Sequence, residues 1–151
     1  MPGGGIETST RSARVAGFDG GVREVEIPLV AAPFGAEPTL FEFLNQPELR
    51  FLACRGEGEN LWLNLDWIAW VELAQPDSEV AFHVAAGARR LAATVELVTG
   101  ETLAGEVVFV PSAPAGGISE LLAGSDRFLL VGNDEGLRLV HRAAIARLRS
   151  G

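Results

Sequence analysis

The chain has 151 residues, of which 48% are hydrophobic and 21% are charged. This composition is typical of a globular protein and excludes disorder for the body of the chain, because enough apolar surface exists to offset the entropy lost on folding. A formal net charge of −8 argues against non-specific binding to nucleic acid or to an anionic membrane, since both reward an excess of Lys and Arg.

The sequence also bounds the cellular setting. The single cysteine, Cys54, cannot form a disulfide within the chain, so no oxidising compartment is required. The N-terminus lacks the basic and apolar regions of a signal peptide, and no apolar run reaches the roughly 18 residues of a membrane span. We therefore expect a cytoplasmic protein with no membrane partner.

Many short strands are predicted along the chain. Residues 1–10 include three consecutive glycines and little to bury, and are expected to form a disordered tail. Beyond them, apolar residues alternate or form β-branched runs, and Gly, Pro, Asn or Asp interrupts these runs every 8 to 12 residues or so. The order predicted for the first part is a strand near Val15, a turn at 19–21, strand 22–30, loop 31–38, a short turn at 40–44, strand 51–54, turn 55–60 and strand 61–73.

A connector is expected at 74–90, and the alternation over 79–84 predicts an additional strand within it. The clearest hairpin follows, because residues 93–98 alternate and the segment at 99–101 has turn chemistry before a second run at 102–110. Gly105 within that second run predicts a bulge or a sharp bend.

The last part of the chain continues this pattern. A loop at 111–117 precedes one predicted helical turn at 118–122, and residues 127–131 and 137–140 form a further hairpin. Residues 143–148 are ambiguous, because Ala and Arg favour helix while the position favours a closing strand.

An internal repeat resolves this ambiguity. A shift of 77 places Phe51 on Phe128, Leu63 on Val140 and Ile68 on Ile145, and shifts of 78 and 80 align the earlier elements. The order of elements is the same in both parts, so 143–148 is predicted as a strand. We expect an all-β protein with two small barrel units, at 11–73 and 91–150, that pack side by side because each is marginal alone.

A short segment of the second unit resembles a known family. Residues 95–107 match the first motif of Sm-like (LSm-type) proteins, which are strongly bent five-stranded barrels, through Val95, Leu97, Gly100, Leu103, Gly105 and Val107. The pattern of Asn45, Phe51, Asn64, Asp66 and Ile68 also resembles uncharacterised bacterial proteins with tandem Sm-like units. The resemblance implies two tandem Sm-like or SH3-like barrels.

The second Sm-like motif differs in this chain. The family's Arg-Gly pair before the last strand is replaced by Arg142, Ala143 and Ala144 in the second unit and by 64–66 in the first. The glycine with which Sm-like proteins contact RNA is therefore absent from both units.

Two groups of residues are candidate sites. Trp62, Trp67 and Trp70 lie within nine residues, and this density indicates either an interface anchor or barrel core. Arg138, His141 and Arg142 make the C-terminal end basic and are candidates for contact with an anion or a nucleic acid, with a solvated strand face as the alternative.

No catalytic or metal chemistry is predicted. His83, His141 and Cys54 would need carboxylates to complete a zinc site, and no ligand spacing is present. Cys54 lies in an apolar run and is expected in the core. No cofactor is expected, because the glycine-rich stretches lack the Lys and helix of a phosphate-binding loop.

We therefore expect a non-enzymatic binding or assembly module that forms homo-oligomers through its barrel edges or binds another protein. One alternative is an RNA-binding Sm-like protein that uses the basic C-terminal face. A second alternative is a regulatory domain that binds a small molecule.

Overall fold

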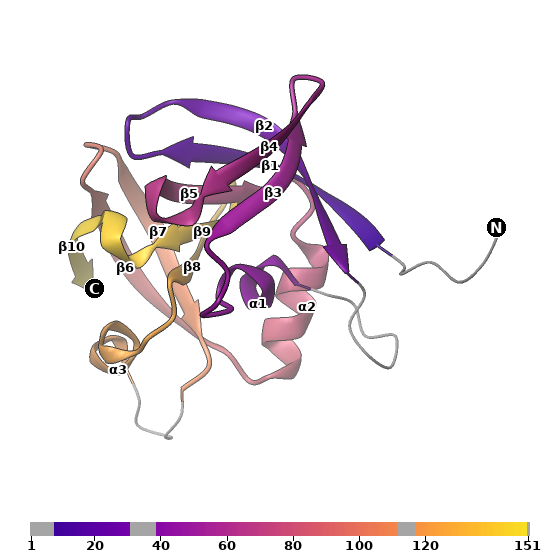
Figure 1. The fold of residues 1–151 in the computed structure, drawn as a ribbon. Helices are drawn as coiled ribbons and strands as arrows, with labels where there is room; N and C mark the ends of the chain where they lie inside the picture. Colours follow the sequence, from indigo (N-terminus) through magenta and orange to yellow (C-terminus); the bar gives the residue numbers. More distant parts are fainter. Residues whose placement is uncertain (1–7, 31–38, 112–116, 151) are drawn as a thin grey trace.

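The computed structural model describes residues 8–30, 39–111 and 117–150, and within them ten antiparallel strands form one sheet (Figure 1). The order of strands is β10-β6-β7-β8-β9-β5-β1-β2-β3-β4. In the described part of the chain β10 and β4 do not pair with each other, so the sheet has two ends and is not closed. The prediction of an all-β protein is confirmed.

The elements of 8–73 and of 89–150 follow one order: strand, strand, short helix, strand, strand, 3-10 turn and strand. The first set is β1 (Thr8–Gly17), β2 (Val22–Val30), α1 (Leu40–Leu44), β3 (Phe51–Gly56), β4 (Glu59–Asn64), η2 (Leu65–Trp67) and β5 (Ile68–Leu73). Helix α2 (Asp77–Ala85) follows. The second set is β6 (Arg89–Leu97), β7 (Thr102–Phe109), α3 (Ile118–Ala123), β8 (Phe128–Asn133), β9 (Gly136–His141), η3 (Arg142–Ala144) and β10 (Ile145–Ser150).

Both hairpins predicted in the second part are confirmed, since β6 pairs with β7 and β8 pairs with β9. The helical turn predicted at 118–122 is α3, and the strand predicted at 143–148 is β10, which begins after η3. Strand β1 already begins at Thr8, inside the predicted tail, while residues 1–7 lie outside the described residues.

The strand predicted at 79–84 is wrong, because these residues belong to α2. Burial in this segment falls on Glu79 and His83, which are four residues apart, whereas Val84 is 67% exposed. A spacing of four residues places side chains on one face of a helix. The buried residues of this segment therefore follow the helical spacing and not the apolar alternation that suggested a strand.

Of the two features predicted at Gly105, a bulge or a sharp bend, the bulge is wrong. The register of β6 with β7 runs without a shift through Ala93 and Gly105. Gly105 instead allows a close approach of the next strand, because a Cβ atom there would lie 2.3 Å from the carbonyl oxygen of Gly132. The glycine therefore keeps β7 and β8 close together.

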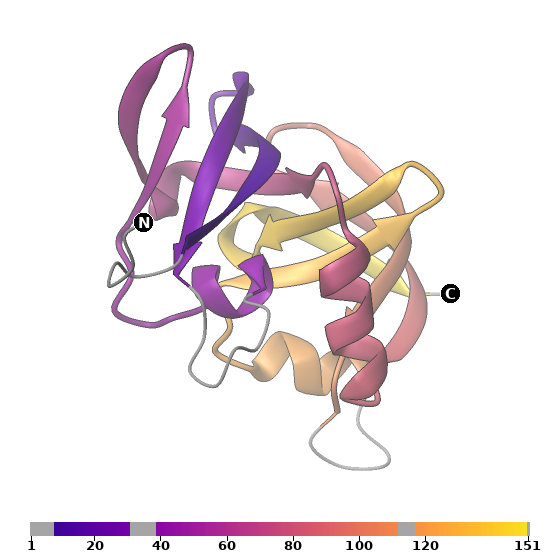
Figure 2. The ribbon, with the colours of Figure 1, turned by 90° about the vertical axis from the view of Figure 1, so that its right-hand side faces the viewer.

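The buried apolar residues form two clusters, and the strands at the middle of the sheet contribute to both. The first cluster fills the part made by β1, β2, β3 and β5 but also holds Phe128, Leu130 and Leu139 from the second part of the chain. The second cluster is centred on Val95 and Val107 and holds Ala69 and Trp70 from β5. In two perpendicular views α1, α2 and α3 lie toward the same end of the molecule (Figures 1 and 2).

Replacement of Gly105 by alanine should lower the free energy of unfolding by about 1–3 kcal/mol, because the added methyl group forces β7 away from the backbone of β8. Chemical denaturation measures this loss. Gly117→Ala is the matched control, since a Cβ atom there meets nothing within 4 Å. Equal stability of the two variants would contradict the close approach at Gly105.

Candidate functional site

The centre of the sheet is a junction between the two parts of the chain. Strands β5 and β9 pair there, with Trp70 opposite Val140, Val71 opposite Leu139 and Glu72 opposite Arg138. The side chains of Val71 and Leu139 belong to the first apolar cluster, whereas Trp70 and Val140 belong to the second. The pairing of β5 with β9 therefore forms part of both cores.

A polar network is built around Trp70 at this junction. The guanidinium carbon of Arg138 lies 4.1 Å from the centre of the Trp70 ring, and the indole Nε1 donates to Oε1 of Glu101 at 2.9 Å. Arg138 donates to Oε2 of Glu101 at 2.8 Å and to Oε2 of Glu72 at 3.1 Å. Arg14 donates to the other oxygen of Glu72 at 3.0 Å. The network thus connects β1, β5, β9 and the turn before β7.

The charge state of Arg138 is fixed by these contacts. Burial acts to lower its pKa, but the hydrogen bonds to Glu101 and Glu72 outweigh that effect, and the pKa is raised above its ordinary value. The residue stays a cation and is hydrogen-bonded to both carboxylates that face it.

The three tryptophans do not form one cluster. Trp70 is 3% exposed and belongs to the core, whereas Trp62 on β4 and Trp67 in η2 are 67% and 64% exposed. Core was one of the two readings of these residues and applies to Trp70. An interface role for Trp62 and Trp67 stays a prediction.

The basic residues singled out from the sequence are engaged inside the chain. Arg138 belongs to the network at the junction, and Arg142 donates to the carbonyl oxygens of Asp126, Leu121 and Leu122. His141 is buried, and its Nδ1 accepts from the N–H of Ala143 at 2.9 Å. These three side chains therefore do not converge on a common anion site.

Burial lowers the pKa of His141, Asp66 raises it and Arg127 lowers it, and the net direction is downward. The imidazole is therefore neutral at neutral pH, in agreement with the acceptor role of its Nδ1.

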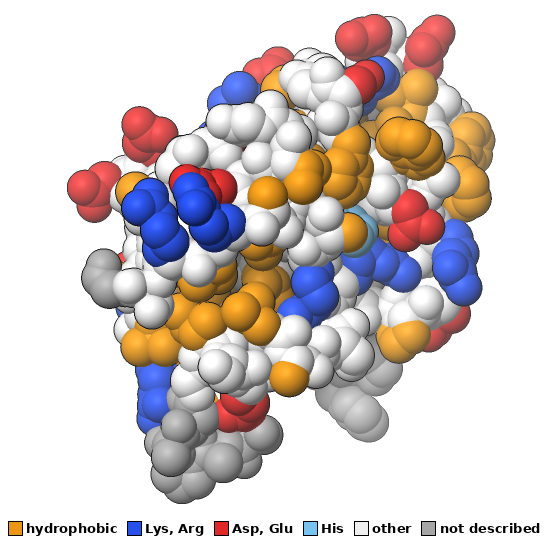
Figure 3. Space-filling model, turned by 90° about the vertical axis from the view of Figure 1, so that its left-hand side faces the viewer, with side chains coloured by type: hydrophobic (Ala, Val, Ile, Leu, Met, Phe, Trp, Pro, Cys, Tyr) orange, Lys and Arg blue, Asp and Glu red, His pale blue; other side chains and the backbone are white. Residues whose placement is uncertain are grey.

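The two end strands of the sheet carry different side chains. On β3 and β4, Phe51 and Trp62 share one face, because they pair with Asn64 and Ala53, and Phe51 is 52% exposed. On β10, Arg147 hydrogen-bonds to Glu96, and Arg149 lies 3.8 Å from the same carboxylate. Figure 3 views the side of the molecule on which β10 lies and shows apolar side chains there with basic side chains beside them.

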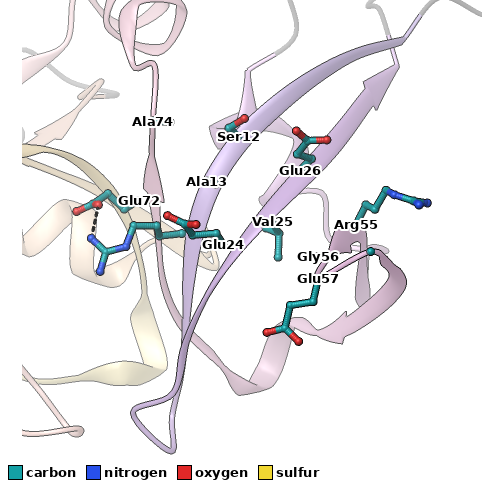
Figure 4. Close-up of a pocket in the computed structure, with 12 residues that line it drawn as sticks. Ser12, Ala13, Glu24, Val25, Glu26, Arg55, Gly56, Glu57, Glu72 and Ala74 are labelled. Carbon is teal, nitrogen blue, oxygen red and sulfur yellow. Dashed lines mark hydrogen bonds and ion pairs between the residues drawn. The ribbon is translucent and has the colours of Figure 1, made fainter.

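A groove of about 500 Å³ lies between β1, β2 and the end of β3. Its charged side chains are Arg14, Glu24, Glu26, Arg55, Glu57 and Glu72. Figure 4 shows that the carboxylates of Glu24, Glu26 and Glu57 lie apart from one another. Arg14 forms an ion pair with Glu72 at 3.0 Å. The charged groups of this groove do not meet at one point, as the reacting groups of an active site would.

Cys54 is buried, as expected from its apolar run. Burial raises the pKa of its thiol, although Arg23 acts in the opposite direction, so the reactive thiolate is disfavoured. Among the described residues, no three or more His, Cys, Asp or Glu side chains are placed to share a metal ion. No described helix combines the length and apolar character of a membrane span.

Comparison of the chain with family models, with curated proteins and with solved structures gives no match.

Sequence reasoning missed one buried charged group, Glu79 of α2. Its carboxylate accepts from the N–H groups of Leu40 and Phe41, the latter at 3.3 Å, and so joins α2 to the first turn of α1. Burial raises the pKa of Glu79, the two backbone hydrogen bonds and Arg11 lower it, and Glu42 raises it, with a net rise. The signal in the sequence was the four-residue spacing of Glu79 and His83.

Replacement of Arg138 by methionine should lower the free energy of unfolding by about 1–3 kcal/mol, because Glu72 and Glu101 lose a charged hydrogen-bond donor. Urea denaturation measures this loss. Arg90→Met is the control, since Arg90 and Glu106 form an exposed ion pair at 3.6 Å, and a change within about 0.5 kcal/mol is expected there. Comparable losses in the two variants would contradict a structural role for the network.

The raised pKa of Glu79 predicts a specific dependence of stability on pH. The carboxylate of Glu79 binds a proton more readily in the folded chain than in the unfolded chain. Its contribution to stability therefore falls as the pH rises from the ordinary pKa of glutamate through the raised pKa of Glu79. Glu79→Gln does not titrate, so its stability relative to the wild type should improve over that range.

Thermal unfolding from pH 4 to 8 measures the difference between wild type and Glu79→Gln. Glu48→Gln, which removes an exposed carboxylate, controls for the loss of one negative charge. Parallel curves for wild type and Glu79→Gln would show that the carboxylate is not buried as described.

Proposed function

We propose that this protein is a non-enzymatic assembly module made of two tandem Sm-like barrels, and that its copies join by pairing β4 of one chain with β10 of the next. The proposal treats the chain as an internal duplication in which β4 corresponds to β9 and β10 to β5. It rests on geometry and on the sequence motif at 95–107.

Two local contacts at matching positions support the duplication. The shift of 77 that aligns Phe51 with Phe128 also aligns Asn64 with His141. Both of these side chains cap the 3-10 turn that follows, because Asn64 accepts from the N–H of Asp66 and His141 from that of Ala143. Different residue types thus perform the same local task at matching positions.

The observation that carries the proposal is the pairing of β5 with β9 in the middle of the sheet. In the duplicated arrangement, the end strands β10 and β4 are the counterparts of these two strands, and each lacks a partner on its outer side in the described sheet. An unpaired strand edge is a template for another strand. The chain therefore carries both halves of a second such junction at its two ends.

The internal junction also supplies the register of the proposed one. Transfer of the β5 and β9 pairs by 77 residues places Arg147 opposite Leu63, Leu148 opposite Trp62 and Arg149 opposite Leu61. Glu59 lies two positions before Leu61, so the basic end of β10 meets an acidic end of β4. Because the two edges are different surfaces, copies join head to tail, and we propose that they close into a ring.

We favour assembly over RNA binding for a structural reason. Arg138 and Arg142 both donate hydrogen bonds within the chain, and RNA would have to compete with Glu72, Glu101 and backbone carbonyls for them.

Two substitutions at Leu61 test the proposed edge. Leu61→Glu places an opposite charge across from Arg149, whereas Leu61→Arg places a like charge there, and both remove the same apolar side chain. We expect the wild type and Leu61→Glu to form a discrete multiple of the 16.0 kDa chain, and Leu61→Arg to dissociate at higher concentration. Size exclusion with light scattering on nucleic-acid-free protein measures the masses.

A wild type that is monomeric at high concentration would overturn the proposal. Equal masses for the two Leu61 variants at every concentration would overturn the proposed register. Co-purification of RNA that Leu61→Arg leaves unchanged would favour the RNA-binding alternative.

A further inference from the structure

Exposed apolar side chains gather near the free end of the sheet at β4. Phe51 is 52% exposed and Trp62 is 67% exposed, and the pairing of β3 with β4 places them on one face. Exposed aromatic side chains that share a sheet face indicate a surface that another element covers. At the junction of β5 with β9, the corresponding face of β8 and β9 is covered, and its covering identifies the kind of element expected here.

The counterparts of these residues are completely buried. Phe128 corresponds to Phe51 and Leu139 to Trp62 under the shift of 77, and both counterparts are 0% exposed. They belong to the first apolar cluster, together with Leu40 and Leu44 of α1 and Val71 of β5. The face of β8 and β9 that matches the exposed face of β3 and β4 is therefore part of the core around α1.

Helix α1 is fastened to this face at its C-terminal end. The side chain of Asn45 donates from Nδ2 to the carbonyl oxygen of Phe128 at 3.2 Å and accepts from the N–H of Phe128 at 2.7 Å. Arg127 donates to the carbonyl oxygen of Leu44 at 3.4 Å. The contact is thus both apolar and hydrogen-bonded.

Helix α3 is the counterpart of α1, and its apolar side chains are not all covered. A shift of 78 aligns Leu44 with Leu122 and Asn45 with Ala123. Leu44 is 0% exposed, whereas Leu122 is 41% exposed and Ala123 is also exposed. The chain therefore presents exposed apolar side chains at the C-terminal end of α3 and an exposed aromatic face on β3 and β4.

We propose that α3 of a second copy of this chain seats on the face formed by Phe51 and Trp62, as α1 seats on Phe128 and Leu139. This inference rests on the proposed assembly and adds to it a second contact, outside the strand edges. The occupant is a second copy because the counterparts of Phe128, Leu139 and Leu44, all buried at the internal junction, lie exposed on this chain as Phe51, Trp62 and Leu122.

The proposed contact of α3 with Phe51 and Trp62, called the seat below, differs in one respect from the internal contact of α1 with Phe128 and Leu139. Ala123 takes the place of Asn45, so the two hydrogen bonds to the backbone of residue 128 have no equivalent at residue 51. The contact between copies is consequently apolar, and the internal contact is the stronger of the two.

Disulfide trapping between two different chains tests the seat. One chain carries Cys54→Ser with Phe51→Cys, the other carries Cys54→Ser with Ala123→Cys, and the two are mixed and oxidised. Asn45 bonds to the backbone of Phe128, so the counterpart positions 51 and 123 of neighbouring copies should lie within the roughly 7 Å Cα separation that a disulfide spans. We expect a cross-linked pair of chains in the mixture and none in either chain alone.

A matched control replaces Ala123→Cys with Val84→Cys on the exposed side of α2, where no cross-link to residue 51 is expected. If light scattering shows assembly but residues 51 and 123 do not cross-link in excess of this control, the seat is overturned while the edge pairing stands. If the protein does not assemble at all, both proposals fail.

A gain of affinity provides an independent measurement. Ala123→Asn restores the side chain that fastens α1 and should lower the concentration at which copies assemble by about fivefold for each hydrogen bond regained. Ala123→Ser, which is polar but too short to bond twice to the backbone of residue 51, should leave that concentration within about twofold. Equal behaviour of the two variants would count against the seat.

Discussion

The antiparallel pairing of β5 with β9 is the interaction on which the rest of the structure depends. It brings Trp70 into the core of the second part of the chain and Leu139 into the core of the first. Each part therefore completes the other's apolar cluster. A segment of about 60 residues buries little surface and is marginal on its own, and this exchange of core residues stabilises both parts of the chain.

The polar groups at this junction restrict how the strands pair. Arg138 faces Glu72 across β9 and β5, and it also stacks on Trp70, whose indole is fixed by Glu101. A slip by one residue would turn Arg138 toward the opposite face of the sheet and separate it from Glu72. The network thus supports one register, in addition to any contribution it makes to stability.

The sequence was sufficient for most of the strands and for the order in which they follow along the chain. It was wrong at 61–73, predicted as one strand, where the structure has β4, the 3-10 turn η2 and then β5. Alternation and turn residues gave both hairpins of the second part, and the repeat gave β10, whose composition alone favours helix. It was not sufficient for α2, because Val80, Phe82 and Val84 alternate as in a strand, while the buried residues Glu79 and His83 follow a helical spacing. In the helix Glu79 accepts from N–H groups of α1, a contact across 39 residues that the segment itself does not show.

The candidate site was less accessible from the sequence. Nothing in the segment around Arg138 shows that its partners, Glu72 and Glu101, lie 66 and 37 residues earlier in the chain. The difference between Trp62 and Trp70 was equally hidden, since both belong to strands rich in β-forming residues. Their exposure depends on whether the neighbouring position in the sheet is filled, and strand order is a property of the whole chain.

The separation of β5 from β9 along the chain has a consequence for protein synthesis. Trp70 leaves the ribosome 70 residues before Val140, its partner in the sheet. At typical translation rates of about 5–20 residues per second, the edge of β5 stays uncovered for several seconds on every nascent chain. During that interval neighbouring nascent chains on one messenger carry the same open strand, so the order of synthesis exposes this protein to premature pairing that the finished chain no longer permits.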